Sequence, residues 1–214
     1  MSRKLRNTML LLGALLVCAC GPRRAGQAPP EDPIGALPVA PLPVGSLAGS
    51  SALVLVAGTV VFGDSTQGLL PRRLALLEAA NAQLDTALRA GAREVTWQGL
   101  AEQRRVMRRN PALRTDPDRL PTSYLIAAHE QVPEPLWTDI RMLAALTGAR
   151  YAVVPVAVRI GGTPAALTAT YAMIAVDART GRIVWRGRME GRPAGTPEAA
   201  LAHAAAALVP GPIP

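Results

Sequence analysis

The chain has 214 residues, of which 50% are hydrophobic and 18% charged, a balance typical of a globular protein that excludes a disordered chain. Its formal net charge is +8, and removal of the first 19 residues lowers it by three, to +5, which is ordinary for a protein surface. Aromatic residues make up only 3%, so the arginines lack the neighbouring rings on which nucleic-acid bases stack, and nucleic acid is not an expected partner.

The first 19 residues have the organisation of a bacterial lipoprotein signal. A basic start is followed by an apolar stretch, 9–17, that is too short to cross a bilayer as a permanent helix. The sequence Val17-Cys-Ala-Cys20 resembles the lipobox read by the lipoprotein signal peptidase. The resemblance implies that Cys20 becomes the lipidated first residue of the mature protein, which would anchor it to a membrane of the cell envelope. An ordinary cleaved signal with an incidental cysteine is the alternative.

The residue after the predicted lipid site bears on which membrane holds the protein. Gly21 stands where Asp usually retains a lipoprotein in the inner membrane, so an outer-membrane anchor facing the periplasm is favoured.

Cys18 and Cys20 are the only cysteines, and cleavage removes the first of them. No intrachain disulfide is therefore expected in the mature chain.

Residues 20–50 contain seven prolines. Proline interrupts regular hydrogen-bond ladders and favours extended backbone, so this segment is predicted to be a flexible tether that begins at the lipidated Cys20. The remaining residues, 51–210, are enough for a single folded domain with one core.

The domain begins with a Val-rich apolar run, 51–62, typical of a strand buried on both faces. Leucines at helical spacing over 70–88 then predict an amphipathic helix closed by Gly91. Asn81 lies on the apolar seam of this helix, and the heptad-like spacing leaves a coiled coil as an alternative to packing on a sheet. The other predicted elements are a strand at 93–97, helices at 98–109 and 136–147, strands at 151–160, 167–176 and 182–190, and a helix at 197–209.

Local signals mark several boundaries among these later elements. Pro155 removes a ladder donor from its strand, which predicts a bulge or an edge position. Asp177–Gly181 has the composition of a tight hairpin turn, and Thr196 is placed to cap the last helix. The order β-α-β-α-α-β-β-β-α predicts an α/β (α+β) fold, with a mixed sheet of about five strands and helices packed on it.

Two segments carry a resemblance to a group of envelope domains. These are residues 148–155, with the sequence GARYAVVP, and the hairpin 176–185, with the sequence VDARTGRIVW. Both resemble the curli-secretion channel lipoprotein, the lipoprotein activators of penicillin-binding proteins and the amino-terminal domain of the Tol-Pal translocation protein. The resemblance implies a non-catalytic domain that binds an envelope protein partner in cell-wall synthesis or secretion, and it offers no catalytic residues.

Arginine clusters are the candidate partner-binding residues. Arginine binds carboxylate and phosphate in a fork, so a cluster could receive an acidic partner, a lipid headgroup, a glycan or another polyanion. A solvated face, or pairing with Asp116 and Asp118, is the alternative. The candidates are Arg104, Arg105, Arg108 and Arg109 on a helix, and Arg182, Arg186 and Arg188 on a strand.

A serine esterase is the alternative function. The segment 60–66, with the sequence VVFGDST, resembles the first block of GDSL-type esterases, in which Ser65 would be the nucleophile. That family takes its base from a late D-x-x-H, but Ala200 stands where the Asp before His203 is needed. The competing interpretation is a turn capped by Asp64 or Ser65. No metal-ligand or nucleotide motif is present, and no metal or cofactor is expected.

Overall fold

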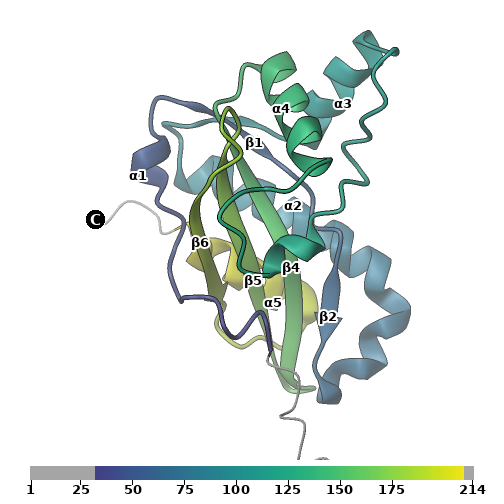
Figure 1. The fold of residues 1–214 in the computed structure, drawn as a ribbon. Coiled ribbons are helices and arrows are strands. Elements are labelled where there is room, and N and C mark those ends of the chain that lie inside the picture. The colour runs from purple at the N-terminus through teal and green to yellow at the C-terminus, as the bar shows by residue number, and fades with distance from the viewer. Residues whose placement is uncertain (1–31, 210–214) are drawn as a thin grey trace, which may run out of the picture. The chain divides into compact units, whose positions relative to one another are not determined.

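The computed structural model describes residues 32–209 (Figure 1). The predicted signal, Cys18, Cys20 and the first part of the predicted tether lie outside the described residues. In chain order the elements are α1 (Val44–Leu47), β1 (Ser51–Val54), β2 (Val60–Phe62), the 3₁₀ helix η1 (Asp64–Arg72), α2 (Arg73–Gly91), β3 (Thr96–Gln98), α3 (Leu100–Arg109), the 3₁₀ helix η2 (Ser123–Ile126), α4 (Leu136–Thr147), β4 (Tyr151–Thr163), β5 (Ala166–Asp177), β6 (Ile183–Glu190) and α5 (Pro197–Leu208).

The strands form one open, six-stranded mixed sheet in the order β3-β1-β4-β5-β6, with β2 also paired to β4. β1 is parallel to β3 and β4, and β2 is parallel to β4, whereas β4, β5 and β6 pair antiparallel. The α/β class and the mixed sheet predicted from the sequence are confirmed. The sheet has six strands rather than five because the apolar run 51–62 is divided into β1 and β2.

The division of that run lies opposite an irregularity in β4. β1 pairs with β4 as far as Val153, and β2 resumes the pairing at Val158. Between these points the register of β4 shifts from Pro155 to Ala157. Proline has no N–H for the ladder, so a continuous neighbouring strand could not be held there. The sequence left a bulge or an edge strand as alternatives for Pro155. The bulge is correct, because β4 lies between β1 and β5 and is not an edge strand.

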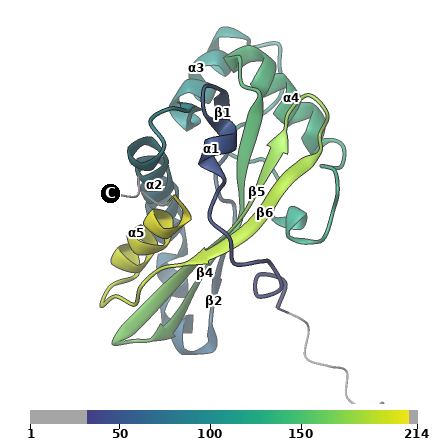
Figure 2. The ribbon, with the colours of Figure 1, turned by 90° about the vertical axis from the view of Figure 1, so that its left-hand side faces the viewer.

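Helices cover both faces of the sheet, as Figures 1 and 2 show. α2 and α5 pack on one face and α4 on the other. The helix predicted over 70–88 therefore packs on the sheet, but its buried residues are Leu76, Ala80, Leu84 and Leu88. Leu70 and Leu74, predicted on the apolar stripe, are exposed, because the regular α-helix begins only at Arg73 and turns another row of side chains inward.

Two local predictions, the Asp177–Gly181 turn and the Thr196 cap, are confirmed. Gly181 closes the β5–β6 turn with φ +72°, and Gly148, which follows the helix predicted over 136–147, has φ +71° at the end of α4. In that turn Asp177 Oδ1 accepts hydrogen bonds from the N–H groups of residues 179 and 180. The hydroxyl of Thr196 accepts from the N–H of residue 199 at 3.3 Å and so caps α5.

Residues 32–50, assigned from sequence to the tether, pack on the domain, and we call them the N-terminal strap. Their prolines alternate with apolar side chains that are buried, namely those of Ile34, Leu37, Leu42 and Leu47. Val39 forms a parallel bridge with Arg188 on the outer edge of β6. The sequence pattern missed this packing because the strap contains only one short helix and no regular strand.

Candidate functional site

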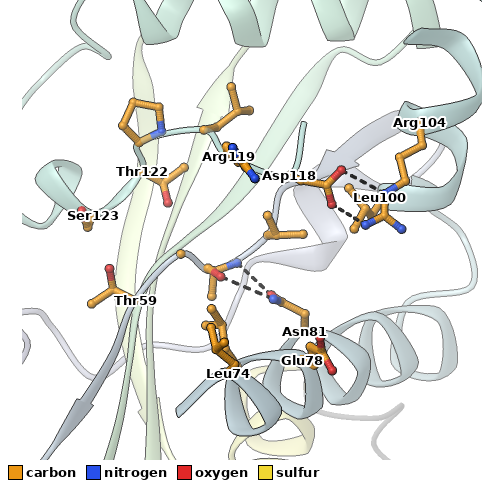
Figure 3. A pocket seen from close by; sticks show the side chains of 16 residues that line it. Thr59, Leu74, Glu78, Asn81, Leu100, Arg104, Asp118, Arg119, Thr122 and Ser123 are labelled. Carbon is orange, nitrogen blue, oxygen red and sulfur yellow. Dashed lines mark hydrogen bonds and ion pairs between the residues drawn. The ribbon is translucent and has the colours of Figure 1, made fainter. Parts of the chain in front are cut away.

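A cleft of about 720 Å³ opens where β1 gives way to β2. Its walls come from α2, the start of α3 and the segment 118–123, as Figure 3 shows. β1 lies between β3 and β4, and the helices that connect these parallel strands, α2 and α4, cover opposite faces. In open α/β sheets the crevice beyond the carboxyl end of such a strand is where ligands bind. The topology therefore places the cleft at the position most suited to recognition.

Two polar side chains hold the backbone where the strand is interrupted. The N–H of Ala57 donates to Asn81 Oδ1 at 2.8 Å, and Asn81 Nδ2 donates back to the Ala57 carbonyl at 3.4 Å (Figure 3). The Thr122 hydroxyl donates to the Pro155 carbonyl at 3.4 Å. Asn81, which sequence reasoning placed on a helix seam, thus takes the place of a neighbouring strand. The position of Asn81 within the apolar stripe of the predicted helix was the sequence feature that could have indicated this hydrogen-bonding role.

Gln103 fixes α3 to the end of the sheet. Its side chain is fully buried, and Nε2 donates to the carbonyls of Val54 at 2.8 Å and Gln98 at 3.0 Å. These bonds satisfy carbonyls at the ends of β1 and β3. Its Oε1 has no hydrogen-bond partner among the described residues. α3 is therefore positioned by a buried contact rather than by its charged face.

The arginines of α3 divide into one paired residue and three unpaired ones. Arg104 donates from Nε to Asp118 Oδ2 at 3.0 Å at the mouth of the cleft, and this hydrogen bonding raises the pKa of Arg104. Arg105, Arg108 and Arg109 are exposed and form no ion pair with residues 32–209.

The arginines of β6 are placed differently. Arg186 donates to the carbonyls of Leu125, Ala127 and His129, the last two at 2.8 and 2.7 Å, and burial lowers its pKa. Arg188 Nε donates to a strap carbonyl at 3.0 Å. Of the three β6 arginines predicted to bind a partner, Arg186 and Arg188 therefore hold neighbouring segments of this chain, and Arg182 alone is exposed.

The residues of the esterase interpretation do not come together. The hydroxyl of Ser65 donates to the Gly162 carbonyl, and no hydrogen bond in the described part of the chain joins it to a histidine. His203 contacts the Arg192 carbonyl through Nδ1 at 3.1 Å. Neither Asp64 nor Ser65 caps the 3₁₀ helix, whose N-cap is Gly63. The turn is held instead by Thr66, whose hydroxyl donates to carbonyls in the turn and in β4.

Within residues 32–209, no group of three or more His, Cys, Asp or Glu side chains is arranged to hold a metal ion. No helix in that range is both long and apolar enough to cross a membrane.

No protein-family model matches the chain, and no curated protein matches its sequence. Solved structures similar to it include the LpoB C-terminal domain from Salmonella enterica, 17% identical, covering 68% of this chain and 84% of that one, with a TM-score of 0.39. Lipoprotein GNA1162 from Neisseria meningitidis is 18% identical, with coverages of 67% and 80% and a TM-score of 0.33. The PelC dodecamer from Paraburkholderia phytofirmans is 11% identical, with coverages of 80% and 89% and a TM-score of 0.35. GNA1162 is itself a lipoprotein, the class of protein that the sequence resembles.

Proposed function

We propose that this chain is a lipid-anchored lipoprotein of the bacterial envelope whose domain binds a protein partner and catalyses no reaction. The observation that carries the proposal is the composition of the cleft. Leu74 stands at its edge with 76% of its surface exposed, beside Leu100 and the mutually neutralised pair of Arg104 and Asp118. Exposed apolar side chains beside a cleft are typical of surfaces that become buried in a complex.

The anchor is proposed at Cys20, in the outer membrane and facing the periplasm, on the strength of the lipobox and Gly21. The role in cell-wall synthesis or secretion is proposed from the resemblance of 148–155 and 176–185 to the envelope group. An esterase is disfavoured because Ser65 is engaged with a backbone carbonyl.

Crosslinking in intact cells, followed by affinity capture and mass spectrometry, tests the proposal. We expect a wall synthase or a secretion component to be recovered with the native protein and reduced at least fivefold by Leu74→Glu. Val184→Glu is the matched control, because Val184 is also exposed, at 53%, but lies on β6 away from the cleft. Cys20→Ser should move the protein out of the membrane fraction. Equal recovery with both Glu variants, or an ester-hydrolysis activity abolished by Ser65→Ala, would contradict the proposal.

A further inference from the structure

The outer face of α3 carries positive charge that the domain does not neutralise. Arg105, Arg108 and Arg109 are exposed and unpaired within residues 32–209, and Arg105 and Arg109 are four residues apart on the helix. Like charges at this spacing destabilise a helix. Among the described acidic residues, only Asp118 forms an ion pair with an arginine of α3, and that arginine is Arg104. The fold therefore keeps an arrangement that its own stability does not favour.

The opposite face of the same helix is fixed. Gln103 is bonded to the ends of β1 and β3, and Met107 packs against the core that includes α4. A charged group on a rigid element loses less freedom when it binds than one on a loop. The three arginines are thus presented from a rigid base.

We propose that this arginine face of α3 receives an acidic segment of the protein partner. Guanidinium groups bind carboxylates through paired hydrogen bonds, which suits a segment rich in Asp or Glu. A second copy of this chain is a poor occupant, because it has 15 acidic residues against 23 basic ones, and Asp32, Asp85 and Asp118 are among those already paired with arginine. The inference rests on the proposed function and specifies the chemistry of its partner.

The position of α3 argues for a protein rather than a lipid surface. The described chain begins at Asp32, whose carboxylate pairs with Arg159 of β4. Arg159 lies eight residues along β4 from Tyr151, about 26 Å at the usual rise of a strand. Figures 1 and 2 place α3 toward the end of the sheet opposite to the first residues of the strap. The arginine face therefore lies toward the end of the sheet opposite to Asp32, the described residue nearest in sequence to Cys20.

The test uses the mature lipidated protein in phosphatidylcholine vesicles and a fluorescent peptide of alternating Glu and Ala residues. The variant is Arg105→Gln/Arg108→Gln/Arg109→Gln. The control is Arg73→Gln/Arg93→Gln/Arg179→Gln, which removes the same charge from exposed arginines that form no ion pair among the described residues. We expect binding at least tenfold weaker for the α3 variant, within twofold of native for the control, and suppressed by salt.

Two outcomes would overturn the inference. Equal weakening by both triple variants would mean that the peptide responds only to net charge. The second outcome uses the unlipidated Cys20→Ser protein and phosphatidylglycerol vesicles. If the α3 substitutions abolish its binding to these vesicles but leave peptide binding unchanged, the arginine face binds lipid headgroups instead. Circular dichroism shows whether each variant is folded. Anchoring is read separately from the membrane fraction. A failed anchor would count against the proposed function, and the peptide binding of native and variant chains would then be compared without lipid, in solution.

Discussion

Replacing Asn81 with leucine removes the amide that holds the broken strand at the cleft. Ala57 is only 2% exposed, and its N–H depends on the 2.8 Å bond to Asn81 Oδ1. A buried N–H without a partner costs about 1–3 kcal/mol, and the 3.4 Å bond from Nδ2 to the Ala57 carbonyl adds little. We expect Asn81→Leu to lower the free energy of unfolding by about 2 kcal/mol. For a domain of this size that is a fall in Tm of roughly 4–8 °C.

Urea unfolding followed by circular dichroism measures this change. Gln83→Leu is the matched control, because Gln83 is also a half-buried amide on α2 and makes no hydrogen bond within the described structure. Glutamine and leucine have similar helix propensities, so the control should stay within about 0.5 kcal/mol of native. Asn81→Asp keeps the acceptor for the Ala57 N–H and should lose only about 1 kcal/mol. If Asn81→Leu is as stable as the native protein, the hydrogen bonds of Asn81 to Ala57 do not stabilise the fold, and the reasoning is refuted.

Three further changes test other contacts. Hydrogen bonds from Arg159 lower the pKa of Asp32 from 3.8 to about 2, so the pair stabilises the fold above pH 4 and its contribution fades as pH falls from about 4 to 2. Asp32 is 47% exposed, so after solvent screening Asp32→Asn should cost about 1 kcal/mol at pH 7, less than half of that at pH 2 and almost nothing at pH 1, and an equal loss of Tm at pH 7 and pH 2 would contradict this. Arg186→Gln removes three hydrogen bonds to the loop 125–129 and should speed its proteolysis about tenfold, whereas cleavage as slow as in Arg182→Gln would show that the bonds are dispensable. A Cβ at Gly191 would lie 2.4 Å from a backbone nitrogen of α5, so Gly191→Ala should cost over about 2 kcal/mol in urea unfolding; the same small loss as in a Gly195→Ala control would refute the clash.

The elements that the sequence predicted well are those decided by neighbours a few residues away. The Asp177–Gly181 turn needs one carboxylate and one residue with positive φ, and both lie within the turn. The Thr196 cap depends on an N–H three residues on. Such interactions are visible in a short window, so most of the longer helices and strands were predicted in the correct order, whereas α1, η1, η2 and the division of 51–62 were not. The class of the sheet followed from that order.

The features that the sequence missed depend on distant partners. The interruption of 51–62 is matched by a bulge at Pro155, about a hundred residues later. Arg186 was predicted to bind a partner because alternation along β6 carries no information about the loop 125–129, whose carbonyls its guanidinium contacts. Gln103 lies among arginines in sequence but is the fully buried residue of α3. The candidate arginines could be named from sequence, but which of them stay unpaired could not.

The packing of the strap changes what an anchored domain can reach. A tether from Cys20 to residue 50 would have thirty steps of at most about 3.6 Å, or roughly 108 Å. Because the domain begins at Asp32, only twelve steps remain, or about 43 Å. With the lipid on Cys20, as we propose, Asp32 would lie within about 43 Å of the bilayer surface. The packing of residues 32–50 on the domain thus shortens the proposed tether by more than half.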